Sequence, residues 1–201
     1  MPRAGLSTAA VIDAGATLAD EVGMAGVSFA ALAERLGVRP PALYKHVQSV
    51  DDLRHGIATL AMNDLAETLR DNLQGRSGST AVGALFDAVS AYIDAHPGRY
   101  EATTIARLEG VGDPLVGATS RVIDSVRAVL AEYGLAVGEV DHAVRTVRCL
   151  IQGYASLRAA DAFQWSNDPD ESMDWMVRFI HAGLVQMGRA HDGDAVEEVA
   201  S

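Results

Sequence analysis

Apolar residues recur every three to four positions along most of the chain and rarely alternate one by one with polar residues. A spacing of three to four matches the turn of an α-helix, whereas alternation would indicate a β-strand. Alanine, leucine and arginine, which favour helices, are abundant, and aromatic residues make up only 5% of the chain. The pattern predicts an all-α fold of about nine helices.

The first predicted helix begins at Ser7 or Thr8, because either hydroxyl can cap a helix N-terminus. Its apolar face consists of Val11, Ala14, Leu18 and Val22. Gly23 and Gly26 then end the helix, since glycine is a poor residue for a helix interior.

Two short helices follow. Ser28 can cap the first of them, and Gly37 comes after it, where a left-handed backbone conformation costs glycine little. Pro40 and Pro41 fit the first turn of the next helix, because the N–H that proline lacks has no partner there. This helix ends near His46. A capped helix, a glycine turn and a short second helix form a helix-turn-helix, which presents its second helix to the major groove of DNA.

The rest of the chain predicts a larger helical body. A long helix starts near residue 50, and residues 75–79 are a candidate linker after it. Further helices are predicted at about residues 80–95, 100–109, 114–134, 138–162 and 169–189. Residues 1–49 are thus expected to form a three-helix DNA-binding domain, residues 50–190 a helical ligand-binding and dimerisation domain, and residues 191–201 a flexible acidic tail.

The formal net charge of −11 argues at first against a nucleic-acid partner, because phosphates repel an acidic protein. The charge is unevenly distributed, however. Residues 1–50 contain four basic and four acidic side chains, whereas residues 51–201 contain 12 basic and 23 acidic ones. Residues 35–50 carry three positive charges, including Lys45, the only lysine of the sequence, and no negative one. The distribution is therefore compatible with DNA binding by the first 50 residues.

Several other classes of protein are disfavoured. Cys149 is the only cysteine, so an intrachain disulfide is impossible. No signal-peptide run is present, and no stretch approaches the roughly 18 apolar residues that span a bilayer, which predicts a cytoplasmic protein without a membrane partner. The six histidines lack zinc-ligand spacing, and no phosphate-binding loop or nucleophile elbow occurs. We therefore expect no metal, no cofactor and no catalytic residues.

The stretch VSFAALAERLGVRPPALYKHVQSVDDL, residues 27–53, closely resembles the DNA-binding head of the tetracycline-repressor family. The matching residues are Ser28, Leu32, Ala33, Leu36, Gly37, Val38, Leu43, Tyr44, His46, Val47 and Leu53. The resemblance covers about residues 7–55 and implies a one-component regulator that binds double-stranded DNA as a homodimer and senses a small molecule. One position departs from the family: Val50 stands where a lysine commonly holds a phosphate, and Gln48 or Ser49 could partly replace it.

The resemblance also implies roles for individual residues. The residues that begin the recognition helix and would lie nearest the base edges are Arg39, Pro40, Pro41 and Ala42. Arg39 could pair with a guanine, and the methyl group of Ala42 could meet a thymine methyl. The residues that would reach phosphates are Ser28, Tyr44, Lys45 and His46.

Some of these residues also have purely structural interpretations. Tyr44 could pack its ring beneath the first helix, and His46 could be a helix-terminal residue stabilised by the helix dipole. Lys45 has the least structural reason to be where it is, which favours a phosphate contact. Arg3 could act as an arm in the minor groove.

The helices predicted at residues 138–162 and 169–189 carry apolar stripes. The stripes consist of Val140, Val144, Val147 and Ile151 on the first and Met173, Val177, Ile180 and Leu184 on the second. Two such helices can pair with their copies in a second subunit as a four-helix bundle, or they can face only the core of their own monomer. Trp175, Met176 and Phe179 add apolar surface beyond one stripe, which favours a homodimer.

Part of the body resembles a ligand-binding subfamily named for a Trp-His-Gly motif. The resemblance lies in residues 148–163 and 170–184, where Gly153 matches and Gln152 replaces the histidine. The polar or aromatic candidates to line a ligand pocket are Phe86, Tyr92, His96, Tyr100, Arg107, Arg148, Gln152 and Tyr154. Their apolar surroundings favour a hydrophobic or amphipathic effector.

The sequence thus predicts a DNA-binding transcriptional regulator, a repressor released by a small effector, and not an enzyme. Two alternatives remain open: a helical small-molecule sensor or adaptor that does not bind DNA, and an all-helical enzyme. One exposed face formed by Arg39, Tyr44 and Lys45 would favour the regulator. Burial of that face would favour the adaptor, and a cleft with converging carboxylates would favour the enzyme.

Overall fold

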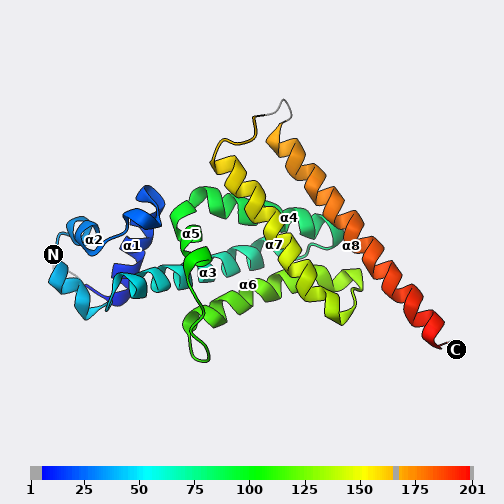
Figure 1. The fold of residues 1–201 in the computed structure, drawn as a ribbon, viewed down its shortest axis with the longest axis horizontal. Helices are drawn as coiled ribbons and strands as arrows, with labels where there is room; N and C mark the ends of the chain where they lie inside the picture. Colours follow the sequence, from blue (N-terminus) through cyan, green and yellow to red (C-terminus); the bar gives the residue numbers. More distant parts are fainter. Residues whose placement is uncertain (1–5, 165–167, 200–201) are drawn as a thin grey trace. The chain divides into compact units, whose positions relative to one another are not determined.

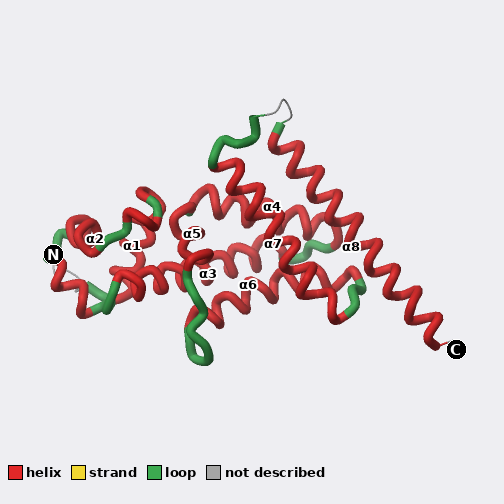
Figure 2. Tube along the Cα trace, viewed as in Figure 1, coloured by secondary structure: helices red, strands yellow, loops and turns green. Residues whose placement is uncertain are grey.

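The computed structural model of the chain describes residues 6–164 and 168–199. Over these residues the chain consists of helices joined by turns and loops, and no strand occurs among them (Figures 1 and 2). The all-α prediction is confirmed. Each predicted helix has a counterpart among the described residues, with the 3-10 helix η2 as the third.

The elements follow one another in a simple order, with α for α-helices and η for 3-10 helices. They are α1 (Thr8–Val22), η1 (Met24–Gly26), α2 (Phe29–Leu36), η2 (Pro40–Lys45), α3 (Val50–Leu73), α4 (Gly78–Ala95), α5 (Pro97–Ile105), α6 (Pro114–Leu130), η3 (Ala131–Tyr133), α7 (Val137–Ala159) and α8 (Pro169–Val199).

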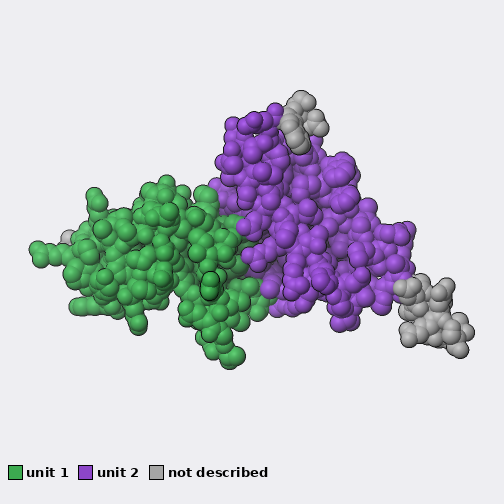
Figure 3. Space-filling view, viewed as in Figure 1, with its two compact units in different colours: residues 1–66, 95–121 green, residues 67–94, 122–201 purple. Residues whose placement is uncertain are grey.

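The chain divides into two compact units (Figure 3). Unit 1 comprises residues 1–66 and 95–121, and unit 2 comprises residues 67–94 and 122–201. Helices α3 and α6 each contribute to both units. Unit 1 contains the whole predicted DNA-binding domain and also α5, which lies far away in the sequence. The functional boundary at residue 49 stays a prediction.

Unit 1 is organised by a small apolar core. Its fully buried side chains include Val11, Leu32, Leu43, Leu53 and Ile57. Two glycines let α1 and α3 approach closely. A Cβ at Gly15 would lie 2.9 Å from a methyl group of Leu53, and a Cβ at Gly56 would lie 2.8 Å from a methyl group of Ile12. This packing holds the start of α3 against the helix-turn-helix.

Helices α1 and α5 each supply a carboxylate that accepts a hydrogen bond from a backbone N–H at or near an end of the other helix. Asp20, near the end of α1, accepts a hydrogen bond of 2.9 Å from the backbone N–H of Arg99 in the first turn of α5. The same carboxylate forms an ion pair of 2.9 Å with the Arg99 guanidinium. In the other direction, the carboxylate of Glu101 accepts a hydrogen bond of 3.0 Å from the backbone N–H of Met24, just beyond α1. Because each helix satisfies polar groups of the other, α5 belongs to the same unit as the helix-turn-helix.

In unit 2, α7 and η3 both pack against α8. A hydrogen bond of 2.8 Å joins the Tyr133 hydroxyl to Nδ1 of His181, and a Cβ at Gly188 would overlap the backbone carbonyl of Tyr133. Burial raises the pKa of Tyr133. The small residue at position 188 therefore sets how closely α8 approaches η3.

Two predicted helix boundaries are wrong. Helix α5 covers Pro97–Ile105 rather than about 100–109, because Pro97 takes the first helical position instead of only ending the preceding helix. Helix α8 continues to Val199, well beyond the predicted end near residue 189. Residues 190–199 contain no proline and a single glycine, so nothing stops the helix there. Most of the segment predicted as a flexible tail is therefore helical, and residues 200–201 lie outside the described residues.

The close approach of α5 to α1 leads to a prediction for Gly98. A Cβ at this position would overlap the backbone carbonyl of Ala19, which cannot rotate away as a side chain could. We expect Gly98→Ala to lower the free energy of unfolding by roughly 2–4 kcal/mol, within the range of severe packing defects. Urea denaturation followed by circular dichroism measures the change.

Gly117→Ala is the matched control. Gly117 lies within α6, and nothing is within 4 Å of a Cβ placed there. The alanine should stabilise the helix by about 0.5–1 kcal/mol, because glycine in a helix interior is unfavourable. If both variants unfolded at the same urea concentration, the docking of α5 through Gly98 would be contradicted.

Candidate nucleic-acid interface

Helix α2 is delimited by a cap at each end. The hydroxyl of Ser28 accepts a hydrogen bond of 3.2 Å from a backbone N–H in the first turn. At the other end, Gly37 adopts a left-handed conformation with φ 64° and ψ 32°. The N–H groups of Gly37 and Val38 donate to the carbonyls of Glu34 and Ala33 at 3.1 and 3.0 Å. These bonds form a Schellman motif, so the turn expected at Gly37 is confirmed.

The element after the turn, η2, is a 3-10 helix. Side chains three residues apart line up in such a helix, because it has three residues per turn. The N–H of Ala42 donates to the Arg39 carbonyl at 2.9 Å, which extends this geometry to the N-cap residue. One row of side chains, called the recognition row below, consists of Arg39, Ala42 and Lys45. A second row consists of Pro41 and Tyr44, and Leu43 is fully buried in the core.

The residues predicted to touch DNA lie mainly on the surface. The exposed ones are Ser28, Arg39, Pro40, Pro41, Tyr44 and Lys45, and the half-buried ones are Ala42 and His46. No ion pair of Arg39 or Lys45 is formed with the side chains that the structure describes, those of residues 6–164 and 168–191. Two positive charges are therefore available on this surface, as a DNA-binding function requires.

Tyr44 combines a packing contact with exposure. Its ring meets the ring of Phe29 edge to face, with centroids 4.9 Å apart and planes at 80°. The residue is nevertheless 60% exposed. The ring therefore packs against α2 rather than beneath α1. His46 accepts a hydrogen bond of 3.4 Å at its carbonyl from the Thr8 hydroxyl, which ties the end of η2 to the start of α1.

Arg35 is engaged within the protein. Its guanidinium donates two hydrogen bonds to the carboxylate of Glu21, at 2.6 and 2.8 Å, and lowers the pKa of that carboxyl group. The pair joins α1 to α2. Of the three positive charges in residues 35–50, only those of Arg39 and Lys45 therefore remain for a partner.

The start of α3 is capped by neighbouring residues. The hydroxyl of Ser49 accepts a hydrogen bond of 3.0 Å from the N–H of Asp52. The carboxylate of Asp52 in turn accepts a hydrogen bond of 2.7 Å from the N–H of Gln48. Val50 is the first residue of the helix. Ser49, considered from the sequence as a substitute for the usual lysine, is thus already used in a cap.

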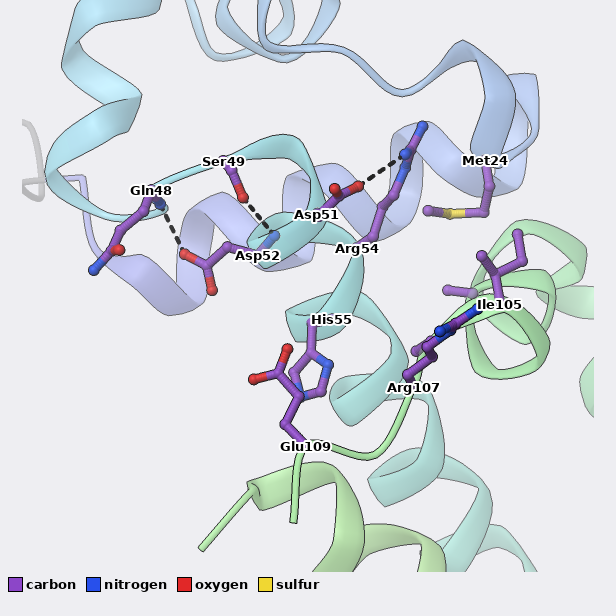
Figure 4. Close-up of a pocket in the computed structure, with 12 residues that line it drawn as sticks. Met24, Gln48, Ser49, Asp51, Asp52, Arg54, His55, Ile105, Arg107 and Glu109 are labelled. Atoms are coloured by element: carbon purple, nitrogen blue, oxygen red, sulfur yellow. Dashed lines mark hydrogen bonds and ion pairs between the residues drawn. The ribbon is translucent and has the colours of Figure 1, made fainter.

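A cavity of about 510 Å³ lies within unit 1 (Figure 4). Its walls are the start of α3 and the end of α5 with the loop that follows. The lining residues are Met24, Gln48, Ser49, Asp51, Asp52, Arg54, His55, Ala102, Ile105, Ala106, Arg107 and Glu109. Two of the three carboxylates are engaged locally: Asp52 caps α3, and Asp51 pairs with Arg54 at 3.1 Å. The arrangement does not favour an acid–base catalytic site.

A nearly buried carboxylate fixes the loop that forms one wall. The side chain of Asp113 is 4% exposed and lies 2.8 Å from Nε2 of His55. It also accepts hydrogen bonds from the N–H groups of Glu109 and Leu115, at 2.9 and 2.8 Å. The bond from Glu109, with smaller help from His55, lowers the pKa of Asp113.

The eight ligand-pocket candidates occupy different environments. His96, Tyr100 and Arg107 lie in unit 1, where Arg107 lines the cavity and His96 contacts Asp20 at 3.2 Å. The other five candidates belong to unit 2 and are Phe86, Tyr92, Arg148, Gln152 and Tyr154. Phe86, Tyr92 and Tyr154 are buried, Gln152 is half-buried and Arg148 is exposed.

Tyr154 is held inside unit 2. Its hydroxyl donates to the carbonyl of Pro169 at 3.0 Å, and its burial raises its pKa. The guanidinium of Arg158 lies 5.5 Å from the centre of its ring. These contacts give Tyr154 a packing role, whatever further role it has toward a ligand.

The dimer-interface candidates divide into buried and half-buried residues. Those buried in the monomer are Val147, Ile151, Met173, Ile180 and Leu184, and those half-buried are Val140, Val144 and Val177. The stripes therefore face mainly the monomer's own core. Large exposed apolar residues lie elsewhere on α7 and α8, among them Trp175 and Phe179 at 56% and 61% exposure.

Sequence reasoning missed most of the cavity lining and could not place one DNA-binding candidate. Met24, Ile105 and Ala106 were not singled out, because no local pattern shows that the segment after α5 returns to α3. The contact of His55 with Asp113, 58 residues further on, is what joins them. Arg3, considered as a minor-groove arm, lies outside the described residues.

The geometry of residues 28–47 defines a helix-turn-helix DNA-binding protein. Residues 11–57 match the sequence model of the bacterial regulatory proteins of the tetR family, and residues 82–180 match that of the tetracyclin repressor-like C-terminal domain. The chain is 33% identical over 189 residues to the uncharacterized HTH-type transcriptional regulator YobS of Bacillus subtilis (strain 168), covering 92% of this chain and 95% of the relative. The chain therefore belongs to the TetR family and is a DNA-binding transcriptional regulator.

Solved structures share the fold. A protein of unknown function from Rhodococcus sp. RHA1 superposes with a TM-score of 0.76 at 18% identity, covering 92% of this chain and 99% of that one. A TetR variant from Acinetobacter baumannii AYE, in complex with minocycline, superposes with a TM-score of 0.68 at 22% identity over 91% of this chain and 98% of that one.

Membership of the TetR family bears on the choice between a regulator and an enzyme. Its members, including the relative above, are transcriptional regulators rather than enzymes. No helix among the described residues is long and apolar enough to cross a membrane. The assignment of the C-terminal domain to the Trp-His-Gly subfamily stays a prediction.

The contacts of Asp113 predict a specific dependence of stability on pH. Its pKa is lowered in the folded protein, so the ionised form stabilises the fold. That contribution should be present above the unfolded pKa of about 3.9 and be lost as the pH falls from there through the lowered folded value. We expect Asp113→Asn to destabilise the protein near neutral pH and to approach the parent protein in stability as the pH falls below the lowered folded pKa of Asp113.

Urea titrations at a series of pH values between about 6 and 2.5 test this prediction. Asp71→Asn is the control, because Asp71 is exposed and bonded to the neighbouring Arg70. A difference between Asp113→Asn and the parent that stayed constant over the whole series would show that the charge of Asp113 is not responsible.

Proposed function

We propose that this regulator is a homodimeric repressor that binds a pseudopalindromic operator through η2 and leaves it when a small hydrophobic or amphipathic molecule binds. The observation that carries the proposal is the recognition row, which presents Arg39 and Lys45 without an ion pair within the described residues. Repression would follow from occupation of the promoter. A regulator that acts on chromosomal DNA works in the cytoplasm, which is where we place it.

The recognition row has a spacing suited to a major groove. Three residues of a 3-10 helix advance by about 6 Å. This is comparable to one or two base-pair steps, since the rise is about 3.4 Å per base pair. Arg39 would donate two hydrogen bonds to a guanine, and the methyl group of Ala42 would contact a thymine methyl close by. Lys45 would then extend toward a phosphate.

The remaining contacts would fix the orientation of the head. Pro40 and Pro41 have no N–H to donate, so near the base edges they offer apolar contact only. Tyr44 is largely exposed, and His46 follows two residues later; both would reach phosphates. Ser28 is exposed at the positive N-terminus of α2, where a phosphate is also stabilised. Such contacts set position rather than sequence preference.

Dimerisation would use the exposed surface of α7 and α8. The rings of Trp175 and Phe179 stack with centroids 5.2 Å apart and an angle of 12°. Two large aromatic side chains that are more than half exposed are unfavourable in water and typical of a surface that meets a partner. Leu157 on α7 and Met187 on α8 add apolar area, at 49% and 47% exposure. These exposed residues are better candidates than the buried stripes.

A symmetric dimer would place two recognition elements on successive major grooves. The required separation is about 34–36 Å, one turn of DNA, so the operator half-sites would be related by a pseudo-two-fold axis. A change in this separation would be sufficient to release the DNA.

The effector would act on unit 2, and the response would pass along the chain from α4 to α5, which follows it directly. The structural neighbour in complex with minocycline is of this fold, and the aromatic side chains of Phe86, Tyr92 and Tyr154 supply an apolar interior in unit 2. Within unit 1, the caps between α1 and α5 would transmit any displacement of α5 to the helix-turn-helix. Coupling between such sites is typically about 1–3 kcal/mol, or 5–150-fold in operator affinity.

Substitutions in the recognition row test the proposed contacts with DNA. Arg39→Ala and Lys45→Ala should both weaken binding to an operator duplex, but in different ways. Arg39→Ala should cost about 1–3 kcal/mol and relax the preference for one G·C pair. Lys45→Ala should weaken binding to all sequences and make the dependence on salt shallower by about 0.9 per protomer. Fluorescence anisotropy across salt concentrations separates the two effects.

Arg76→Ala serves as the control, because Arg76 is an exposed arginine in the turn after α3, outside the helix-turn-helix. It should leave both affinity and salt dependence close to those of the parent. Wild-type protein that binds no duplex at low salt, or that binds all sequences equally, would refute the repressor.

A substitution on α8 tests the proposed dimer interface. Phe179→Glu places a charge in the exposed aromatic pair and should convert a species of twice the 21.2 kDa chain mass into monomers. Sedimentation equilibrium measures the mass. Leu108→Glu makes a similar apolar-to-acidic change at a residue that is 56% exposed in unit 1, and it should leave the dimer intact. Dimers of Phe179→Glu at micromolar concentration would exclude the proposed interface.

A further inference from the structure

The surface that follows the recognition row carries the opposite charge. Asp51 and Asp52, called the acidic corner below, occupy the first turn of α3 and are both exposed. The Asp51 side chain is 89% exposed. The acidic corner is separated from Lys45 by only a few residues, so cationic and anionic surfaces adjoin at one end of the helix-turn-helix.

The chain geometry limits how far the backbone at the acidic corner can lie from the backbone of Lys45. The carboxylate of Asp52 is bonded to the N–H of Gln48, which is three residues beyond Lys45. Three residues span at most about 11 Å. The Debye length is about 10 Å at 0.1 M salt. The charge of Asp52, which is bonded to the backbone of Gln48, therefore acts on a phosphate that approaches this part of the backbone.

The N-terminus of α3 has little to offer a phosphate. Its cap hydroxyl on Ser49 accepts the N–H of Asp52, and the N–H of Gln48 is bonded to the Asp52 carboxylate. Two carboxylates in the first turn offset the positive end of the helix dipole. The cation of the same turn, Arg54, is paired with Asp51 at 3.1 Å. Val50, the first residue of the helix, contributes no charge.

We infer that the acidic corner weakens sequence-independent attraction to the DNA backbone, so that operator occupancy depends on the base contacts of the recognition row. The inference rests on the proposed recognition of an operator by the recognition row. Contacts to phosphates supply essentially all non-specific binding and are the same for every sequence. Removing attraction there lowers the affinity for competing DNA and raises the ratio of specific to non-specific binding. The acidic corner thus determines selectivity without touching a base.

The ion pair between Arg54 and Asp51 affects what a substitution of Asp51 should do to DNA binding. While Asp51 is ionised, its pair with Arg54 has no net charge, so the net negative charge of the acidic corner is that of Asp52. Asp51→Asn would release the Arg54 charge as well as remove a negative one, and both changes favour backbone contact. The double variant Asp51→Asn with Arg54→Gln would lack the released cation and should therefore gain less than the single variant.

The test compares an operator duplex, selected from a random library by the wild-type protein, with a duplex of random sequence. Val50→Lys should bind the random duplex roughly tenfold more tightly at 0.1 M salt, and its salt dependence should steepen by about 0.9 per protomer. Asp51→Asn should bind the random duplex about two- to fivefold more tightly. In both variants the ratio of operator to random-duplex affinity should fall.

Asp71→Asn is the matched control for net charge. Asp71 also lies on α3, is exposed and pairs with a neighbouring arginine, Arg70, at 3.1 Å. The substitution removes the same charge near the other end of the helix and should change random-duplex affinity much less than Asp51→Asn. Circular dichroism and urea titration of every variant confirm that it is folded.

The outcomes separate the inference from the proposed function. If wild type prefers its operator but Val50→Lys and Asp51→Asn leave random-duplex affinity and salt dependence unchanged, the acidic corner has no such effect. An equal gain from Asp71→Asn would also overturn the inference, because total charge would then be responsible. If wild type prefers no sequence, the repressor proposal fails, while the change in random-duplex affinity still decides whether the acidic corner repels DNA.

Discussion

Helix α5 can lie on α1 only because residue 98 has no side chain to collide with the backbone carbonyl of Ala19. The contact places Asp20 next to the first turn of α5 and Glu101 next to the N–H of Met24, so each helix satisfies polar groups of the other. The helix-turn-helix therefore packs in one unit with α5, a segment that is about 80 residues away in the sequence. The compactness of unit 1 follows from this contact, and so does the direct route from α5 to the DNA-binding surface.

Much of the head could be predicted from the sequence because its determinants are local. Ser28, Gly37 and Pro40 act on backbone groups within a few residues of themselves, and the structure shows the cap, the left-handed turn and the helix start where these residues indicate. The docking of α5 could not be predicted in this way. It depends on hydrogen bonds between residues 77 and 79 positions apart, which leave no periodic signal.

Periodicity also has a limit in the body of the protein. The stripes on α7 and α8 were visible, but an apolar stripe looks the same whether it faces its own core or a second subunit. The structure shows most of their residues buried in the monomer, and it is Trp175 and Phe179, off the stripes, that remain exposed. The cavity of unit 1 was missed for a related reason. Its wall includes a loop that a single nearly buried carboxylate, Asp113, holds against α3.

The two prolines at the start of η2 have a thermodynamic consequence. Each fixes its own φ near −65°, and Pro41 also restricts Pro40. Leu43 of the same short helix is fully buried and holds the helix against the core. The DNA-contacting backbone is therefore already ordered in the free protein, so binding requires little additional loss of conformational entropy in this segment. The head should associate with DNA as a preformed surface, without the large ordering cost that disordered recognition segments incur when they fold on their target.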